Sequence, residues 1–226
     1  MQACHLALVV GLLSFHLHGA PTLGLVNVTP ITAVIGTPTQ VTVTASITDP
    51  ALIPGGANLL QLNPDGSTTI LGVLHDDGRN GDAVAGDFVL TLVVTLNAPS
   101  ASQIQLEVSA AFKGVLQRIK SPIVNVFFQS ANAPQAAAAA LSSLLIAGNI
   151  SNALNYVGPA YTSVLGALSQ QGLNVLASIL NNAVLVASAG DLRIFRSAFL
   201  APDGTTTTIE FSMVPGPSGQ WVINTW

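Results

Sequence analysis

The stretch QVTVTASIT, residues 40–48, decides the fold of the N-terminal half. Its valine, alanine and isoleucine side chains occupy every second position and alternate with polar residues. Because the side chains of a β-strand point alternately to the two faces of a sheet, this period predicts a strand with one buried face. Further strands are expected at 59–62, 68–74, 88–96, 104–112 and 122–128. Turn residues divide these runs, so we predict an antiparallel β-sandwich over residues 21–130.

The character of the sequence changes at ANAPQ, residues 131–135, which we interpret as a linker between two domains. Residues 136–147 open with consecutive alanines and carry leucines at helical spacing, which predicts a helix. Shorter helices are expected at 151–157, 161–169 and 173–180, and strands at 183–189, 192–200, 206–213 and 220–225. Helices followed by an antiparallel meander predict an α+β domain over residues 136–226. The expected fold class is therefore mainly β plus α+β.

The composition restricts the classes of function. Hydrophobic residues make up 50% of the chain and charged residues only 7%, against about 25% in an average soluble domain. This profile is typical of extracellular, β-rich surfaces. The net charge is −4, and the largest basic cluster is Lys113, Arg118 and Lys120, so we expect no nucleic-acid binding. Cys4 is the only cysteine, which excludes a disulfide or a cysteine–metal framework.

The N-terminal residues have the pattern of an export signal. LALVVGLLSFHL, residues 6–17, is an apolar run that ends before the small residues Gly19 and Ala20. This pattern predicts a cleavable signal peptide over residues 1–20 and a secreted or extracytoplasmic protein, in the periplasm or at the cell surface. The run is shorter than the roughly twenty apolar residues of a transmembrane helix, so we expect no stable membrane span after cleavage. A retained anchor is the alternative.

The densest polar cluster is HDDGRNGDAVAGD, residues 75–87, which holds four of the ten acidic residues. Calcium takes about six to eight oxygen ligands from carboxylates, amides and carbonyls, and glycines allow a loop to turn these oxygens inward. The sequence therefore predicts a Ca²⁺ site with the ligands Asp76, Asp77, Asn80, Asp82 and Asp87. The alternative is that the Asp-Gly and Asn-Gly pairs form turns in which the side chains bond their own backbone.

Three segments carry resemblances to known families. Residues 74–91 resemble the L-x-D-D-G-x-x-G-D-x-x-A-G-D-G-x-Y-T loop of bacterial immunoglobulin-like domains of the choice-of-anchor type, although FVL, residues 88–90, stands where that loop has Gly-x-Tyr. The resemblance implies an Ig-like sandwich on an exported protein. AGNISNAL, residues 147–154, and GQWVINTW, residues 219–226, resemble segments of the nuclear-transport-factor-two-like superfamily. That resemblance implies a cone-shaped domain with helices on a curved sheet.

No catalytic or cofactor-binding residues are predicted. A Ser-His-Asp site in the mature chain would have to use His75, and there is no Gly-x-Ser-x-Gly motif. Asp191, Arg193 and Arg196 are expected to be solvated charges at a sheet edge. The set Leu154, Tyr161, Leu165 and Leu168 is expected to pack in the core, or else to line a small apolar pocket.

Three hypotheses about function, from different classes, follow from these observations. The first is an exported, non-catalytic binding or structural protein whose sandwich acts as a spacer or adhesion module. Its partners would be an unidentified protein or envelope component, with a homodimer contact through the C-terminal domain. The alternative is a protein that binds a small apolar ligand in the cone. An open apolar cavity favours the ligand and a closed, dry cone favours the structural role. An enzyme is the third hypothesis.

Overall fold

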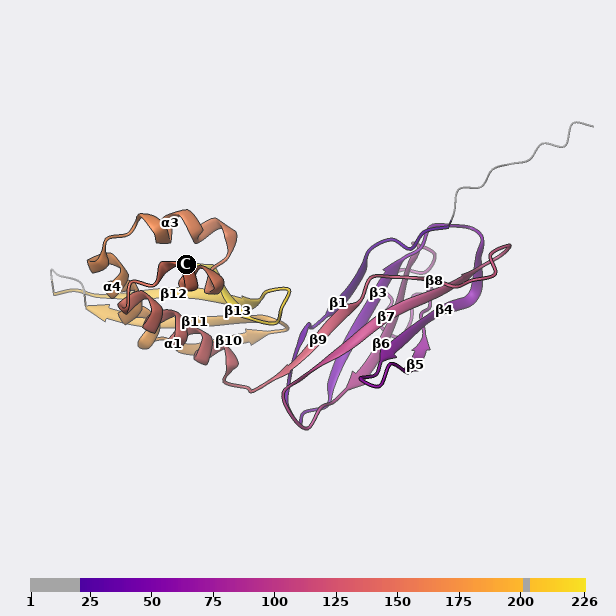
Figure 1. Cartoon of the computed structure of the whole chain (residues 1–226), viewed down its shortest axis with the longest axis horizontal. Helices are drawn as coiled ribbons and strands as arrows, with labels where there is room; N and C mark the ends of the chain where they lie inside the picture. Colours follow the sequence, from indigo (N-terminus) through magenta and orange to yellow (C-terminus); the bar gives the residue numbers. More distant parts are fainter. Residues whose placement is uncertain (1–20, 201–203) are drawn as a thin grey trace, which may run out of the picture.

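The structure is a computed structural model that describes residues 21–200 and 204–226 (Figure 1). Strands contain 45% of the residues and helices 21%, which confirms the expectation of a mostly β chain with several sheets and a few helices. The signal peptide predicted for residues 1–20 lies outside the described residues. In the described ranges, no helix is both long and apolar enough to cross a membrane.

The N-terminal unit, residues 21–129, contains two sheets that share one core (Figure 1). Its strands are β1 (Val26–Thr29), β2 (Thr32–Val34), β3 (Thr39–Ser46), β4 (Leu52–Leu62), β5 (Thr68–Val73), β6 (Val89–Leu96), β7 (Ser102–Phe112), β8 (Ile119–Lys120) and β9 (Val124–Gln129). One sheet has the order β1-β3-β6 and the other β2-β9-β7-β4-β5, with β8 paired to β7. Only β2 and β9 pair in parallel among these strands.

The alternation in residues 40–48 is what builds this core. Val41 and Val43 are 0% exposed, and Ile47 is 2% exposed, while the threonines between them point outward. Phe112 and Phe128 of the facing sheet belong to the same buried cluster. Full burial of such a side chain contributes about 1.5–3 kcal/mol. The alternation therefore makes β3 a large contributor to the core of the N-terminal unit.

One expected strand boundary is wrong. PGG, residues 54–56, lies inside β4, although the sequence pattern placed the start of that strand at Leu59. The register between β4 and β7 shifts between Leu52 and Ala57, so the extra residues are accommodated as an irregularity within the strand. A Cβ on Gly56 would lie 2.7 Å from the carbonyl oxygen of Ile53, which is why a residue without a side chain stands there.

The C-terminal unit, residues 133–226, has helices first and a sheet second. The elements are α1 (Ala133–Ile146), α2 (Ile150–Ala153), η1 (Leu154–Tyr156), η2 (Pro159–Tyr161), α3 (Thr162–Ala167), α4 (Gln170–Asn181), β10 (Val184–Ala189), β11 (Leu192–Leu200), β12 (Thr206–Pro215) and β13 (Trp221–Thr225). The strands pair antiparallel in sequence order. Helix α1 begins before the expected residue 136, because Pro134 occupies its first turn, where proline is favoured.

A carboxylate from the C-terminal unit reaches across to the N-terminal unit. Asp191 Oδ2 accepts a hydrogen bond from the Ile31 amide at 2.7 Å. Its Oδ1 accepts from the amide and the hydroxyl of Thr32, at 3.0 and 2.7 Å. The expectation that Asp191 is a solvated edge charge is therefore wrong, because the chain brings it against β2 from about 160 residues away.

A second set of contacts crosses the same junction. The Gln129 side chain donates to the Gly219 carbonyl at 2.6 Å and accepts from Trp221 Nε1 at 2.9 Å. Gly219 has a φ of +78°, and a Cβ at this position would lie 2.5 Å from the ring of Phe127. The turn before β13 can approach β9 this closely only because the residue is glycine.

Candidate functional site

The structure brings three of the predicted calcium ligands together in the loop between β5 and β6. One carboxylate oxygen each of Asp76, Asp82 and Asp87 lies within 4.8 Å of the other two. Asp82 is buried, Asp76 is half-buried and Asp87 is exposed. Asp77 stands apart, because its Oδ1 accepts a hydrogen bond from the Arg79 amide at 3.0 Å. Asn80, the fifth predicted ligand, has a φ of 52° and serves the turn itself.

Backbone amides bind these carboxylates within the loop. Asp76 accepts from Gly86 at 2.6 Å and from Phe88 at 3.0 Å, and Asp82 accepts from Gly78 at 2.6 Å. The turn bonds that the sequence raised as the alternative are those of Asp77 with the Arg79 amide and of Asp87 with the Val89 amide, each two residues on. The bonds of Asp76 instead close the loop over ten to twelve residues. They leave carboxylate lone pairs free, since a carboxylate offers about four acceptor sites. The loop geometry therefore agrees with turns alone and with turns that also hold a cation.

No carboxylate of the cluster forms an ion pair in the described part of the chain. The described residues contain two ion pairs, Lys120 with Glu107 and Arg196 with Glu210, and both lie outside this loop. Three carboxylates at this separation repel one another, and the repulsion is largest where Asp82 is shielded from water. Hard oxygen donors at such spacing fit the ligand preference of Ca²⁺.

The second candidate site is an apolar pocket in the C-terminal unit. It lies between α3 and α4, and its volume is about 440 Å³. The residues that line it are Val157, Tyr161, Val164, Leu165, Leu168, Gly172, Val175, Leu176, Ile179 and Trp226. None of them is charged, and only the tyrosine hydroxyl and the indole N–H offer side-chain polar atoms. The cavity is open to solvent, so it is neither closed nor dry.

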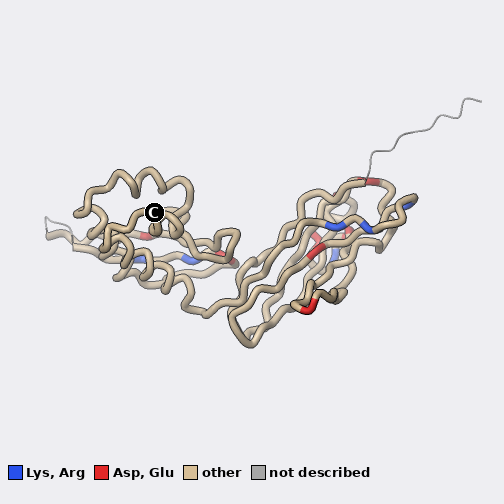
Figure 2. The backbone as a smooth tube through the Cα atoms, in the orientation of Figure 1, with Lys and Arg blue, Asp and Glu red and all other residues tan. Residues whose placement is uncertain are grey.

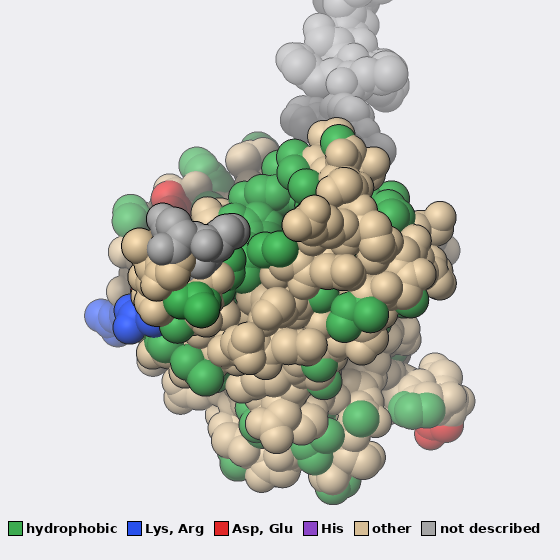
Figure 3. Space-filling model, turned by 90° about the vertical axis from the view of Figure 1, so that its left-hand side faces the viewer, with side chains coloured by type: hydrophobic (Ala, Val, Ile, Leu, Met, Phe, Trp, Pro, Cys, Tyr) green, Lys and Arg blue, Asp and Glu red, His purple; other side chains and the backbone are tan. Residues whose placement is uncertain are grey.

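The pocket has a buried base and an exposed rim. Leu165 is 3% exposed and Ile179 is 6% exposed, whereas Val164 is 54% and Val175 is 42% exposed. Figure 3 shows the end of the molecule that carries this unit, where hydrophobic side chains gather into a patch with few charged groups near it. Figure 2 shows how sparsely charges are spread over the unit as a whole. The rim exposes apolar side chains to water. A contiguous exposed apolar patch often marks a binding site.

The sequence identified part of this pocket. The leading expectation of core packing holds for Leu165, which is buried in the core, and for Leu154 and Tyr161, which pack against it. Tyr161, Leu165 and Leu168 also line the pocket, as the alternative interpretation proposed. The lining residues of α4 were missed: Gly172, Val175, Leu176 and Ile179. Residues three and four positions apart form one apolar face of a helix, and such a face is equally typical of packing against the core. Only the position of α3 decides that this stripe faces a cavity.

The described residues hold no constellation for nucleophilic catalysis. His75 is exposed, and its backbone pairs with Thr91. Arg196 is exposed, as expected, and is paired with Glu210, but it lies on the inner strand β11 and not at a sheet edge. Arg193 is half-buried and lies against Trp221, with its Cζ 5.1 Å from the ring centroid. Neither arginine forms an ion pair with Asp191 in the described part of the chain.

No protein-family model matches the chain, and no curated protein matches it.

Proposed function

We propose that this chain is an exported, non-catalytic binding protein whose C-terminal unit holds a small apolar ligand in the pocket between α3 and α4. The observation that carries the proposal is the lining of that pocket, whose ten residues are mostly apolar and carry no charged side chain. An open cavity of about 440 Å³ falls within the range of about 300–1,000 Å³ typical of small-molecule sites. The alternative that the sequence raised thus has more support than the purely structural role.

The pocket also limits the ligand. A charged group would lose its hydration among these side chains without gaining a partner, so the ligand is neutral along the buried part. Tyr161 supplies a hydroxyl and Trp226 an aromatic face, which suits a ring or a branched hydrocarbon with at most one polar substituent.

The proposal also assigns roles to the N-terminal unit and to the strand β10. The N-terminal unit, an immunoglobulin-like sandwich, acts as a spacer that carries a nuclear-transport-factor-two-like binding unit away from the cell envelope. The hydrogen bonds of Asp191 support a fixed spacer, because they tie the two units together. The uncharged strand β10, which is exposed along its whole length, supports a homodimer contact.

Replacing Gly172 by Leu is the direct test of the pocket. Gly172 lines the cavity, and a Cβ there makes only ordinary contact with Leu168, at 3.4 Å. The isobutyl group would fill the space without breaking the helix, and leucine is the better helix former. We expect the affinity for the neutral fluorophore N-phenyl-1-naphthylamine to fall by about ten-fold or more, equal to about 1.4 kcal/mol. The measurement is a fluorescence titration.

Gly166→Leu is the matched control. Gly166 lies in α3, does not line the pocket, and has nothing within 4 Å of the added Cβ. The same change of residue should leave the titration unaltered. If the protein does not bind the fluorophore, or if both variants bind it as the parent does, the proposed function is wrong.

As a second proposal, the loop of Asp76, Asp82 and Asp87 binds Ca²⁺ and stiffens the N-terminal unit. The convergence of three carboxylates without a paired cation in the described residues supports it. Calcium at about 10 mM is about ten to one hundred times the Kd of about 0.1–1 mM of extracellular sites. It should stabilise the N-terminal unit by about 1.4–2.7 kcal/mol and raise its melting temperature by about 5–10 °C over a sample in EDTA.

Asp87→Asn separates the charge from the hydrogen bonding. Asp87 Oδ1 accepts from the Val89 amide at 2.9 Å, and an asparagine oxygen can keep that bond. The variant should lose most of the calcium effect and melt slightly higher in EDTA, because one repulsive charge is gone. Asp65→Asn is the control: Ser67 donates to Asp65 and lowers the pKa of that carboxyl, so it too is charged. An unchanged melting temperature in calcium for the parent protein would leave these carboxylates as turn residues.

A further inference from the structure

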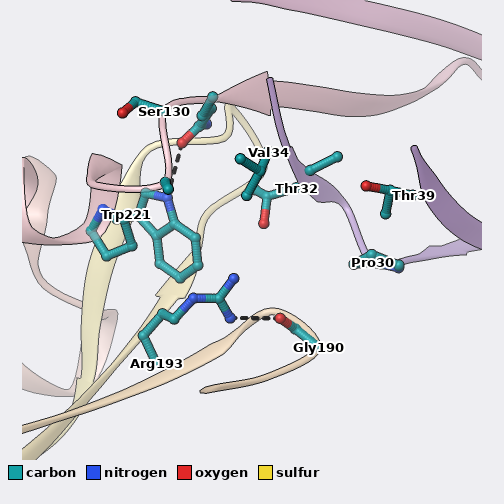
Figure 4. Close-up of a pocket in the computed structure, with 12 residues that line it drawn as sticks. Pro30, Thr32, Val34, Thr39, Ser130, Gly190, Arg193 and Trp221 are labelled. Atoms are coloured by element: carbon teal, nitrogen blue, oxygen red, sulfur yellow. Dashed lines mark hydrogen bonds between the residues drawn. The ribbon is translucent and has the colours of Figure 1, made fainter. Parts of the chain in front are cut away.

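A separate cavity lies at the junction of the two units. Its volume is about 180 Å³, and both units contribute to its walls. From the N-terminal unit come β2 residues such as Thr32 and Val34, and from the C-terminal unit Gly190, Arg193 and Trp221. Figure 4 shows the Arg193 guanidinium between the Gly190 loop and Trp221, with its other side turned toward Thr32 and Val34.

Among the described residues that line this cavity, Arg193 is the only charged one, and three of its five N–H donors have no protein partner in the described chain. Nη1 donates to the carbonyl oxygens of Gly190 and Leu192, at 2.6 and 2.9 Å. The guanidinium also stacks against Trp221, which holds it in place. Nε and Nη2 have no hydrogen-bond partner among the described residues. These contacts hold the guanidinium on one side, and its Nε–H and Nη2–H groups can donate hydrogen bonds to a bound acceptor.

The neighbouring polar groups are already engaged. The Thr32 hydroxyl donates to Asp191 at 2.7 Å, and the Gln129 amide donates to Gly219 at 2.6 Å. Asp191 accepts three hydrogen bonds from the N-terminal unit and makes no ion pair with Arg193 in the described chain. Asp191 is thus engaged with the N-terminal unit, and Arg193 has no ion-pair partner among the described residues.

The free edge selects the class of ligand. Nε–H and Nη2–H lie on the same side of a guanidinium and form a planar fork that fits a carboxylate. Arg196 of this same chain uses the same two donors toward a carboxylate, since its Nε and Nη2 both donate to Glu210 Oε1, at 2.8 and 2.6 Å. We propose that the junction cavity binds a small free carboxylate through Nε and Nη2 of Arg193, with the carbon chain against Val34 and Trp221.

The volume of the junction cavity and the single charge of Arg193 restrict the class of ligand. The volume of about 180 Å³ lies below the range of about 300–1,000 Å³ that drug-sized ligands occupy, so the ligand has few heavy atoms. One arginine matches one negative charge, which favours a monocarboxylate over a phosphate dianion. The site is distinct from the apolar pocket, and its occupant touches both units. A bound carboxylate should therefore hold the junction together more firmly.

The test is an NMR titration of the purified protein with sodium acetate at constant ionic strength. The reporter is the indole N–H of Trp221, with the indole of Trp226 as an internal reference and a Trp226→Phe variant for assignment. We expect a saturable shift for Trp221 alone. Arg193→Gln should weaken the apparent affinity by about ten-fold or more. Arg196→Gln, which alters an exposed arginine that already has a carboxylate partner, should leave it unchanged.

A second variant guards against misfolding of Arg193→Gln. Ala131 is exposed at the cavity, so Ala131→Leu narrows the cavity without touching the arginine and should also weaken acetate binding. The proposal is overturned if the Trp221 signal does not saturate, or if it responds equally in the Arg193→Gln protein. Tighter binding of inorganic phosphate than of acetate would overturn the carboxylate assignment.

Discussion

Phe211→Ala is expected to lower the unfolding free energy of the C-terminal unit by about 3–5 kcal/mol. Phe211 is 2% exposed on β12. Its ring stacks on Phe195 at 5.2 Å with an interplanar angle of 9°, and it contacts Trp226 at 5.2 Å. Removal of the ring leaves a cavity between the sheet and the helices, and it removes the support beneath a residue that lines the apolar pocket.

Differential scanning calorimetry measures this effect. The two units have separate hydrophobic cores, so we expect two transitions, of which only that of the C-terminal unit moves. For a unit of this length, the shift should be at least about 12 °C downward. Phe199→Ala, on the neighbouring strand and only half-buried, should cost much less. If both transitions fall together, the units unfold as one cooperative body and the division into two is wrong.

Asp191→Ala is expected to release the two units from each other. The substitution removes a charged acceptor that serves the Ile31 amide and both donor groups of Thr32. Two amides at the junction then lose their partner. Because hydrogen bonds to a charged group contribute about 1.5–3 kcal/mol and an orphaned donor costs a comparable amount, the loss at the junction is about 2–3 kcal/mol. Small-angle X-ray scattering should show a larger radius of gyration.

Two further variants test whether the effect comes from the hydrogen bonds of Asp191. Thr32→Val removes only the hydroxyl donor and should have a smaller effect of the same sign. Glu210→Ala breaks an exposed ion pair in the same sheet and should change neither the scattering nor the melting, since such pairs contribute about 0–1 kcal/mol. Identical scattering from the parent and Asp191→Ala proteins would contradict a junction held by this carboxylate.

Local patterns predicted most of the long elements, because periodicity depends only on neighbouring residues, but the short strands β1, β2 and β8 were not predicted. The alternation in residues 40–48 became β3, with the expected side chains buried. The run 136–147 fell within or next to α1, and 173–180 lay within α4. The exception at residues 54–56 has the same cause: a Pro-Gly-Gly turn signal is strong locally, and the pairing of β4 with β7 overrides it.

The sites were predictable to the extent that their residues are close in the chain. Asp76, Asp82 and Asp87 lie in one loop, so their convergence was foreseen from spacing, whereas the outward position of Asp77 depends on its bond to the Arg79 amide. The pocket lining of α4 was missed, since a stripe at helical spacing looks the same whether it meets another helix or a cavity.

The sequence by itself determined the mostly β character, the order of strands and helices, and the acidic loop, because periodicity and turn residues act over a few positions. The tertiary structure alone decided which apolar stripe is left open and where Asp191 and Arg193 lie. The bonds from Asp191 to Ile31 and Thr32 span about 160 residues. No local pattern encodes such a contact, because it exists only once two separately packed units have met.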